Sequence, residues 1–324
     1  MRNFIGKTLS GKSASVFLAL LASAAFLALA WRAAGLRPEE IRAAFRSADT
    51  GLLFGVLAAS VAWHVFMGAD KMYRVLKSLG LFVPFREILK WRLGSGPMRV
   101  ILPVDSGEVF DVLYLWRGRG EGADTAAGAV AFESGLNLIG ASFWLGFGLV
   151  LTGAPQGFSR VVAAVSFGLL YAVFFFSTPL HQRLIKSARD FRPSFGRVAS
   201  AVLGPFASCP ARRKLFFAAY GVVFQTRSLW VCWFLLKAFG YSPDSATVIA
   251  GTSIAIFAGH APSVSGMGPR EAAIMLFLAG SAPQPVLFSV GLLLTLFVHV
   301  IPMLVGAPWA LWFFGRLMAK RSEP

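Results

Sequence analysis

Cysteine, histidine and acidic residues are scarce in this sequence of 324 residues. The two cysteines, Cys209 and Cys232, are too few for a disulfide framework or for the four ligands of a structural zinc site. Four histidines are scattered along the chain, and none belongs to an H-E-x-x-H motif. No nucleophile–base pair stands out. We therefore expect no catalytic residues, no metal and no cofactor, and we expect that the protein is not an enzyme.

Charged residues are also few. They make up 14% of the chain, whereas 56% is hydrophobic and the mean hydropathy is +0.66. A soluble domain has about a quarter charged residues and could not bury so much apolar surface. The composition predicts an integral membrane protein.

The net charge of +16 raises the question of nucleic acid. The lysines and arginines, however, lie mainly in the connections between apolar runs, which is typical of cytoplasmic loops held against anionic lipid. We expect membrane lipid as the partner, and no nucleic acid.

Six apolar runs approach or exceed the ~20 residues that cross a bilayer core. We expect spanning helices at about 13–31, 50–69, 126–151, 160–179, 214–236 and 285–305. The first run ends near Ala28-Leu29-Ala30, which also resembles a signal-peptidase site. We favour an uncleaved first membrane helix.

Two further apolar stretches, 86–116 and 246–281, contain helix-breaking residues. The first is interrupted by Gly94-Ser95-Gly96-Pro97 and Pro103, and the second by Pro262 and Gly266-Met267-Gly268-Pro269. Such breaks free backbone groups that hydrocarbon cannot satisfy, so they belong inside protein or beside water. Each stretch is too long for one span and too short for two. We predict two re-entrant hairpins.

The distribution of lysine and arginine predicts the orientation. With the N-terminus inside, the inner segments carry 22 basic residues and the outer loops carry six. This bias favours both termini in the cytoplasm. The two hairpins then enter from opposite sides, which is the inverted repeat of many transporters. The predicted fold is all-α: a single polytopic membrane domain over 1–324, with halves 1–155 and 160–324, about six spanning helices and two re-entrant hairpins, or eight segments in all.

The two breaks have similar sequences. In each, a proline is followed by a Ser-Gly pair and then by a glutamate in the first turn of a short helix: Pro103 to Glu108, and Pro262 to Glu271. Helix N-termini present free N–H groups and a positive dipole end, which suits a phosphate. Arg270 and Arg99 could pair with a phosphate oxygen. The two glutamates are functional candidates because charge is costly in a membrane, although they could instead cap their own helices or pair with these arginines as structural support.

Other polar residues lie at membrane depth: Asp111, Glu133, Asn137, Gln225, Arg227 and His299. Glu133 and Asn137 share one helical face, and Arg227 could bridge to Glu133 as structure or as part of a site. The candidate substrate-binding residues are Arg99, Pro103, Asp105, Gly107, Glu108, Asp111, Glu133, Arg227, Gly266, Gly268, Arg270 and Glu271.

At these motifs the chain resembles the lysylphosphatidylglycerol synthase transmembrane-region family, also called the flippase-like family. The resemblance is carried by Leu102 to Glu108, by Glu133 in the following helix, and by Pro262 to Glu271 with its G-x-G-x-R-E core. The family commonly has an arginine a few residues after the first Gly-Glu, and Glu-Arg in the next helix. Here those places hold Asp111 and Ser134, so the usual headgroup preference cannot be assumed.

The resemblance implies a lipid translocase of the bacterial inner membrane and not a synthase, because synthesis needs an aminoacyl-transferase domain after the membrane part. We expect movement of a lipid with an anionic phosphate headgroup. In this hypothesis Gly107, Gly266 and Gly268 let the backbone approach the headgroup, Arg270 holds phosphate, and Glu108 and Glu271 hold a cationic group or a coupling proton. The alternative is a non-transporting scaffold or partner of a lipid-modifying or envelope enzyme. A homo-oligomer is also possible.

Overall fold

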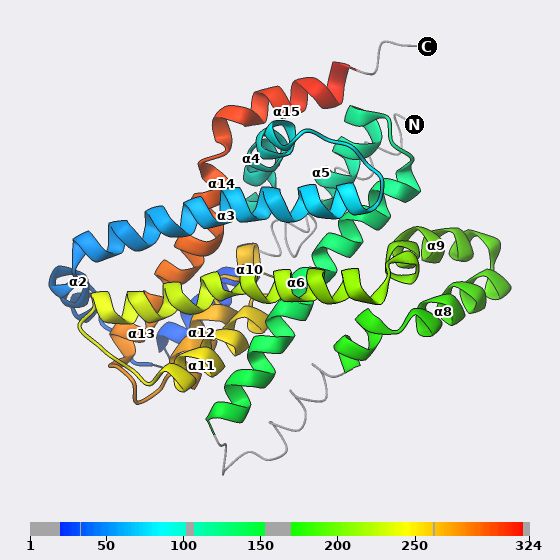
Figure 1. Cartoon of the computed structure of the whole chain (residues 1–324). Helices are drawn as coiled ribbons and strands as arrows, with labels where there is room; N and C mark the ends of the chain where they lie inside the picture. Colours follow the sequence, from blue (N-terminus) through cyan, green and yellow to red (C-terminus); the bar gives the residue numbers. More distant parts are fainter. Residues whose placement is uncertain (1–19, 33, 102–106, 153–169, 262, 320–324) are drawn as a thin grey trace. The chain divides into compact units, whose positions relative to one another are not determined.

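The computed structural model describes residues 20–32, 34–101, 107–152, 170–261 and 263–319 (Figure 1). Within these residues the structure is helical, apart from one isolated bridge between Ala279 and Ala282. The predicted all-α class is therefore confirmed. The helices are Leu20–Arg32, α2 (Pro38–Ser47), α3 (Thr50–Ser78), α4 (Phe85–Ile101), α5 (Glu108–Leu113), η1 (Tyr114–Gly118), α6 (Ala123–Leu151), 170–176, α8 (Thr178–Phe191), α9 (Pro193–Ser208), α10 (Ala211–Ala238), α11 (Ser245–Ala258), η2 (Val264–Gly266), α12 (Pro269–Phe277), α13 (Gln284–Thr295), η3 (Leu296–Val300), α14 (Ile301–Leu304) and α15 (Ala307–Ala319).

Four of the described helices are long and apolar enough to cross a membrane. They are α3, α6, α10 and the continuous helix Gln284–Leu304 formed by α13, η3 and α14. These match the spans predicted at 50–69, 126–151, 214–236 and 285–305. The first predicted span is described from Leu20 to Arg32 as an apolar helix, and the run at 160–179 only from residue 170.

The chain forms two compact units, each built from three separated stretches. Unit 1 contains Met1–Val61, Gly96–Gly107 and Ser228–Val305, and unit 2 contains Ala62–Ser95, Glu108–Arg227 and Gly306–Pro324. The second predicted hairpin lies in unit 1, whereas α5 and η1 of the first lie in unit 2.

Each unit has an apolar core of its own. In unit 1 it joins the end of α10 to α13, with Leu235, Leu287 and Val290 fully buried. In unit 2 the ring of Tyr114 stacks on Trp91 at 4.8 Å and on Phe313 at 5.6 Å, which joins η1 to α4 and α15. These contacts fix α5, which carries two of the candidate residues.

Helices α6 and α10 cross at a pair of glycines in unit 2. A Cβ added at Gly140 would lie 2.2 Å from the Gly221 carbonyl oxygen, and one added at Gly221 would lie 2.2 Å from the Leu136 carbonyl oxygen. Only glycine on both helices allows this approach, which is the way apolar helices pack closely in a membrane. The crossing sets the position of Glu133 on α6.

The first predicted interruption, at Gly94-Ser95-Gly96-Pro97, is wrong, because α4 continues through it from Phe85 to Ile101. Pro97 leaves the Leu93 carbonyl without its helical donor. That carbonyl faces Gly306, where an added Cβ would lie 1.9 Å from its oxygen. Gly94 similarly meets the Trp309 carbonyl and Phe313. The glycines therefore serve helix packing against the chain before and within α15, and the helix tolerates Pro97 because the backbone around it is packed against protein.

Candidate functional site

The second break is a left-handed turn that ends in a helix start. Helix α11 ends at Ala258 and α12 begins at Pro269, as the sequence predicted. Between them Ser265, Gly266 and Gly268 have φ values of 51°, 76° and 96°. Glycine adopts such values without steric cost, and Pro269 suits the first helical position. The turn delivers Arg270 and Glu271 into the first turn of α12.

Glu271 is fully buried and caps its own helix. Its Oε2 accepts a hydrogen bond of 2.5 Å from the Gly268 backbone N–H, and its Oε1 accepts one of 2.6 Å from Thr295 Oγ1 on α13. The N–H bond satisfies one of the unpaired donors of the helix beginning. The capping role considered for this glutamate is thus confirmed.

Arg270 is also buried, with 4% of its surface exposed. Its Nη1 donates to the Ser265 carbonyl at 3.0 Å and to Thr295 Oγ1 at 3.2 Å. The guanidinium lies against Gly259, where an added Cβ would be 2.3 Å from Nη2. We call Ser265, Arg270, Glu271 and Thr295 the α12 cluster. Thr295 is a member that sequence reasoning missed, since a threonine in an apolar span carries no signal by itself.

Helix Leu20–Arg32 packs on this break within unit 1. Ser23 Oγ accepts a hydrogen bond of 2.7 Å from the Val264 N–H. A Cβ added at Gly268 would lie 2.4 Å from Phe26 Cβ, and one added at Gly266 would lie 2.7 Å from Gly259. The space beside Gly266 and Gly268 is therefore occupied by other residues of the protein.

Unit 2 holds a second set of buried charges around α5 and α6. Asp111, fully buried in α5, accepts hydrogen bonds from Trp91 Nε1 at 2.9 Å, Arg92 Nη1 at 3.0 Å and Ser95 Oγ at 3.3 Å. All three donors lie on one face of α4. These bonds hold Asp111, in the first turn of α5, against α4.

Glu133 on α6 continues this network. Its Oε1 lies 2.8 Å from Lys71 Nζ and 3.3 Å from Arg92 Nη2. Lys71 also donates to Asn137 Oδ1, one turn further along α6. We call Lys71, Arg92, Asp111, Glu133 and Asn137 the α5–α6 cluster.

Lys71 and Arg92 were not among the predicted site residues. The charge count assigned both to a cytoplasmic connection, because each lies at the edge of an apolar run. The structure instead extends α3 to Ser78, which places Lys71 inside the helix with its side chain fully buried.

The remaining candidates are placed as follows. Glu108 begins α5 and accepts a hydrogen bond from Ser134 Oγ on α6, and Gly107 before it is buried. Arg227 is 5% exposed, with its guanidinium 5.8 Å from the Phe224 ring centre. The side chain of Arg99, and Pro103 and Asp105 entirely, lie outside the described residues.

The chemistry of these clusters is ionic and hydrogen-bonding. Among the residues that the structure describes, no group of three histidine, cysteine or acidic side chains could hold a metal ion. Both clusters offer charge of both signs in an apolar setting, and the α12 cluster lies at the beginning of a short helix. Such an arrangement can accept a phosphate, an ammonium or a proton.

These features define a multi-pass helical membrane protein that buries ionisable residues at interrupted helices. The model of the family described as the lysylphosphatidylglycerol synthase TM region matches residues 16–306. The chain belongs to this family, as its motifs predicted. No curated protein matches it. Membership indicates a membrane protein involved in lipid handling.

Proposed function

We propose that this protein is a lipid translocase of the inner membrane, with both termini in the cytoplasm, and that it moves a lipid with an anionic phosphate headgroup between leaflets. The observation that carries the proposal is the α12 cluster. There an arginine and a glutamate, 4% and 0% exposed, lie side by side at a helix start in the middle of apolar sequence.

Energetics favour a functional origin for this pair. A charged side chain in the apolar part of a membrane protein costs at least about 2.5–3.5 kcal/mol, so such residues usually mark a substrate or ion pathway. Capping alone needs no charge of either sign, because serine, threonine or asparagine serves as well. In our proposal Arg270 holds the phosphate, and Glu271 holds a cationic group or a coupling proton.

The α12 cluster would reorganise when a headgroup enters. Arg270 Nη1 donates to the Ser265 carbonyl and to Thr295 Oγ1. A phosphate oxygen is a stronger acceptor for a guanidinium, because both partners are charged. A phosphate that entered the cluster would therefore compete with the Ser265 carbonyl and Thr295 Oγ1 for the Nη1 donor.

The α5–α6 cluster supports the same proposal independently. Asp111 and Glu133 are held by Lys71 and Arg92 in the interior of unit 2. Buried ion pairs are often no more stable than apolar replacements of the same volume. These ion pairs are therefore not explained by a gain in folding stability. Their position in the interior is consistent with a path for charged headgroups.

The test is lipid translocation in proteoliposomes. The full chain is reconstituted with fluorescent phosphatidylglycerol, phosphatidylethanolamine or lysylphosphatidylglycerol, and the outer leaflet is quenched chemically. We expect Glu271→Gln and Arg270→Ala to slow translocation at least tenfold. The matched controls Glu39→Gln and Arg42→Ala change the same residue types on the exposed side of α2, and they should keep the rate.

Three results would count against the proposal. If both α12 variants keep full activity, the site assignment is wrong. If the controls slow translocation as much, the effect is not specific to the cluster. If no lipid moves faster than in empty liposomes while an enzyme copurifies in fixed ratio, the protein is a scaffold and not a translocase.

A further inference from the structure

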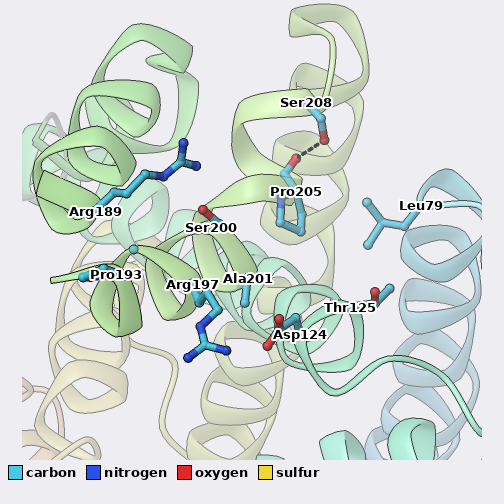
Figure 2. Close-up of a pocket in the computed structure, with 11 residues that line it drawn as sticks. Leu79, Asp124, Thr125, Arg189, Pro193, Arg197, Ser200, Ala201, Pro205 and Ser208 are labelled. Atoms are coloured by element: carbon cyan, nitrogen blue, oxygen red, sulfur yellow. Dashed lines mark hydrogen bonds between the residues drawn. The ribbon is translucent and has the colours of Figure 1, made fainter.

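A cavity of about 720 Å³ opens in unit 2 between the beginning of α6 and the hairpin of α8 and α9 (Figure 2). This volume lies within the range of about 300–1,000 Å³ that small-molecule sites occupy. Its residues lie apart in sequence from both clusters described above. Figure 1 shows α8 and α9 side by side as a helical hairpin.

Two close helix contacts fix the walls of the cavity. A Cβ added at Gly196 on α9 would lie 2.6 Å from Arg189 Cα on α8. A Cβ added at Gly128 on α6 would lie 2.3 Å from the Ala201 carbonyl oxygen and 2.9 Å from Pro205 Cγ on α9. Glycine is needed at both places, so α9 is held between its neighbours at a set distance. The cavity is therefore a built feature of the packing.

The charged residues of the lining are two arginines and one aspartate. Arg189 and Arg197 come from the hairpin and Asp124 from the first turn of α6 (Figure 2). The structure gives neither arginine a hydrogen bond or an ion pair within the described residues. The lining thus carries a formal charge of +1, which one phosphodiester anion would neutralise. Arginine binds phosphate through two parallel N–H donors.

Hydroxyl groups complete the polar part of the lining. Thr125 lies at the beginning of α6, and Ser200 lies on α9 between Arg197 and Pro205. Hydroxyls both donate and accept, so they suit an uncharged polyol attached to the phosphate. A second phosphate or a free carboxylate would meet Asp124 instead.

Apolar side chains project beside these charges. Phe191 and Phe195 are 75% and 51% exposed, and their rings lie 5.8 Å apart. Val198, one residue after Arg197, is 61% exposed. Aromatic and basic residues together on an amphipathic helix are typical of helices that lie in the membrane interface. A ligand held by the arginines would extend its apolar part along this surface.

We propose that this cavity binds the headgroup of an anionic phospholipid. Arg189 and Arg197, whose side chains point to opposite sides in Figure 2, supply the positive charge that attracts the phosphodiester. The acyl chains leave along the surface of Phe191 and Phe195. This lipid site is separate from the α12 cluster, and it does not depend on whether the protein translocates lipid.

The experiment uses a phosphatidylglycerol analogue with a diazirine on its headgroup. The full chain is placed in phosphatidylcholine nanodiscs that contain this probe, and the labelled residues are mapped by mass spectrometry after irradiation. We expect labelling at the beginning of α6 and on α9. The double variant Arg189→Ala, Arg197→Ala should lower it at least tenfold. The matched control Arg183→Ala, Lys186→Ala removes two exposed charges from α8 outside the cavity, and it should lower labelling less than twofold.

A third variant tests the cavity itself. Ser200→Phe keeps both arginines but fills the space, so it should also abolish labelling, and its thermal unfolding midpoint reports whether it folds. Equal loss in the control pair, or full labelling in the double variant or in Ser200→Phe, overturns the proposal. Glycerol 3-phosphate in excess should not displace the probe. If it does, the ligand is a soluble phosphate ester and the assignment to lipid is wrong.

Discussion

Lys71 Nζ lies 2.8 Å from Glu133 Oε1, and these side chains expose 0% and 2% of their surface. Removal of one partner leaves the other charge buried without its closest counter-ion, which costs about 3–5 kcal/mol. We expect Lys71→Met and Glu133→Leu each to lower the thermal unfolding midpoint in detergent strongly. The double variant should recover most of the loss, because an apolar pair of similar volume is often as stable. Single variants that unfold like the wild type would contradict this reading.

Thr295 links Glu271 and Arg270 in the α12 cluster, since it donates to Glu271 and accepts from Arg270. Thr295→Val keeps the shape and removes both bonds. We expect a loss of about 1–3 kcal/mol in stability, measured by thermal unfolding. Ser289→Ala is the matched control on the same helix, because its buried hydroxyl donates only to the Pro285 carbonyl one turn earlier. If both variants lose the same stability, Thr295 has no special role.

Gly268 combines a left-handed φ of 96° with a close neighbour, as an added Cβ would lie 2.4 Å from Phe26 Cβ. Gly280 has a similar φ of 88° but no atom within 4 Å of the added Cβ. Gly280→Ala should therefore cost only the backbone strain of about 1–2 kcal/mol. Gly268→Ala should cost more and displace helix Leu20–Arg32. The difference between the two midpoints measures the packing part, and no difference would mean that Phe26 does not lie against the turn.

Gly140 and Gly146 lie on the same helix, α6, in different surroundings. Gly140 meets the Gly221 carbonyl, whereas nothing lies within 4 Å of a Cβ added at Gly146. Alanine is favoured over glycine in a helix by about 1 kcal/mol. We expect Gly146→Ala to be neutral or stabilising and Gly140→Ala to be destabilising. The measurement is unfolding by urea or by heating. A stabilising Gly140→Ala would exclude the close crossing of α6 and α10.

His181 should make stability depend on pH. Its ring is buried between Phe174 and Phe206, and burial together with the positive charge of Lys214 lowers the pKa of His181 below its ordinary value of about 6.5. Below pH 6.5 the unfolded chain then binds a proton that the folded protein binds less readily. Stability should be fully present above pH 6.5 and fall as the pH is lowered.

The check for this prediction is thermal unfolding at pH 7.5, 6.5 and 5.5. His181→Phe keeps an aromatic ring between the two phenylalanines and removes the titrating group. We expect the variant to show a smaller fall of the midpoint between pH 6.5 and 5.5 than the wild type. Identical pH profiles would exclude His181 as the group responsible.

Local sequence patterns predicted the parts of the site that neighbours along the chain determine. The helix start at Pro269 and the capping role of Glu271 both follow from residues within three positions of each other. The interruption at Gly94 to Pro97 was predicted wrongly by the same local rule. There the glycines and the proline are accommodated by partners more than 200 residues later, and no window of sequence contains both.

By itself the sequence determined that this is a helical membrane protein, where four of its long spans lie, that the 246–281 stretch is interrupted at Gly266–Pro269, and to which family the chain belongs. Run length, proline and glycine decide these features, and all act over short distances along the chain. Only the tertiary structure decided which charges meet. Lys71, Arg92 and Thr295 carry no local signal, and each acquires its role from a side chain 19 to 62 residues away. Burial makes those pairings obligatory, because a charge inside an apolar bundle must find its partner wherever packing places it.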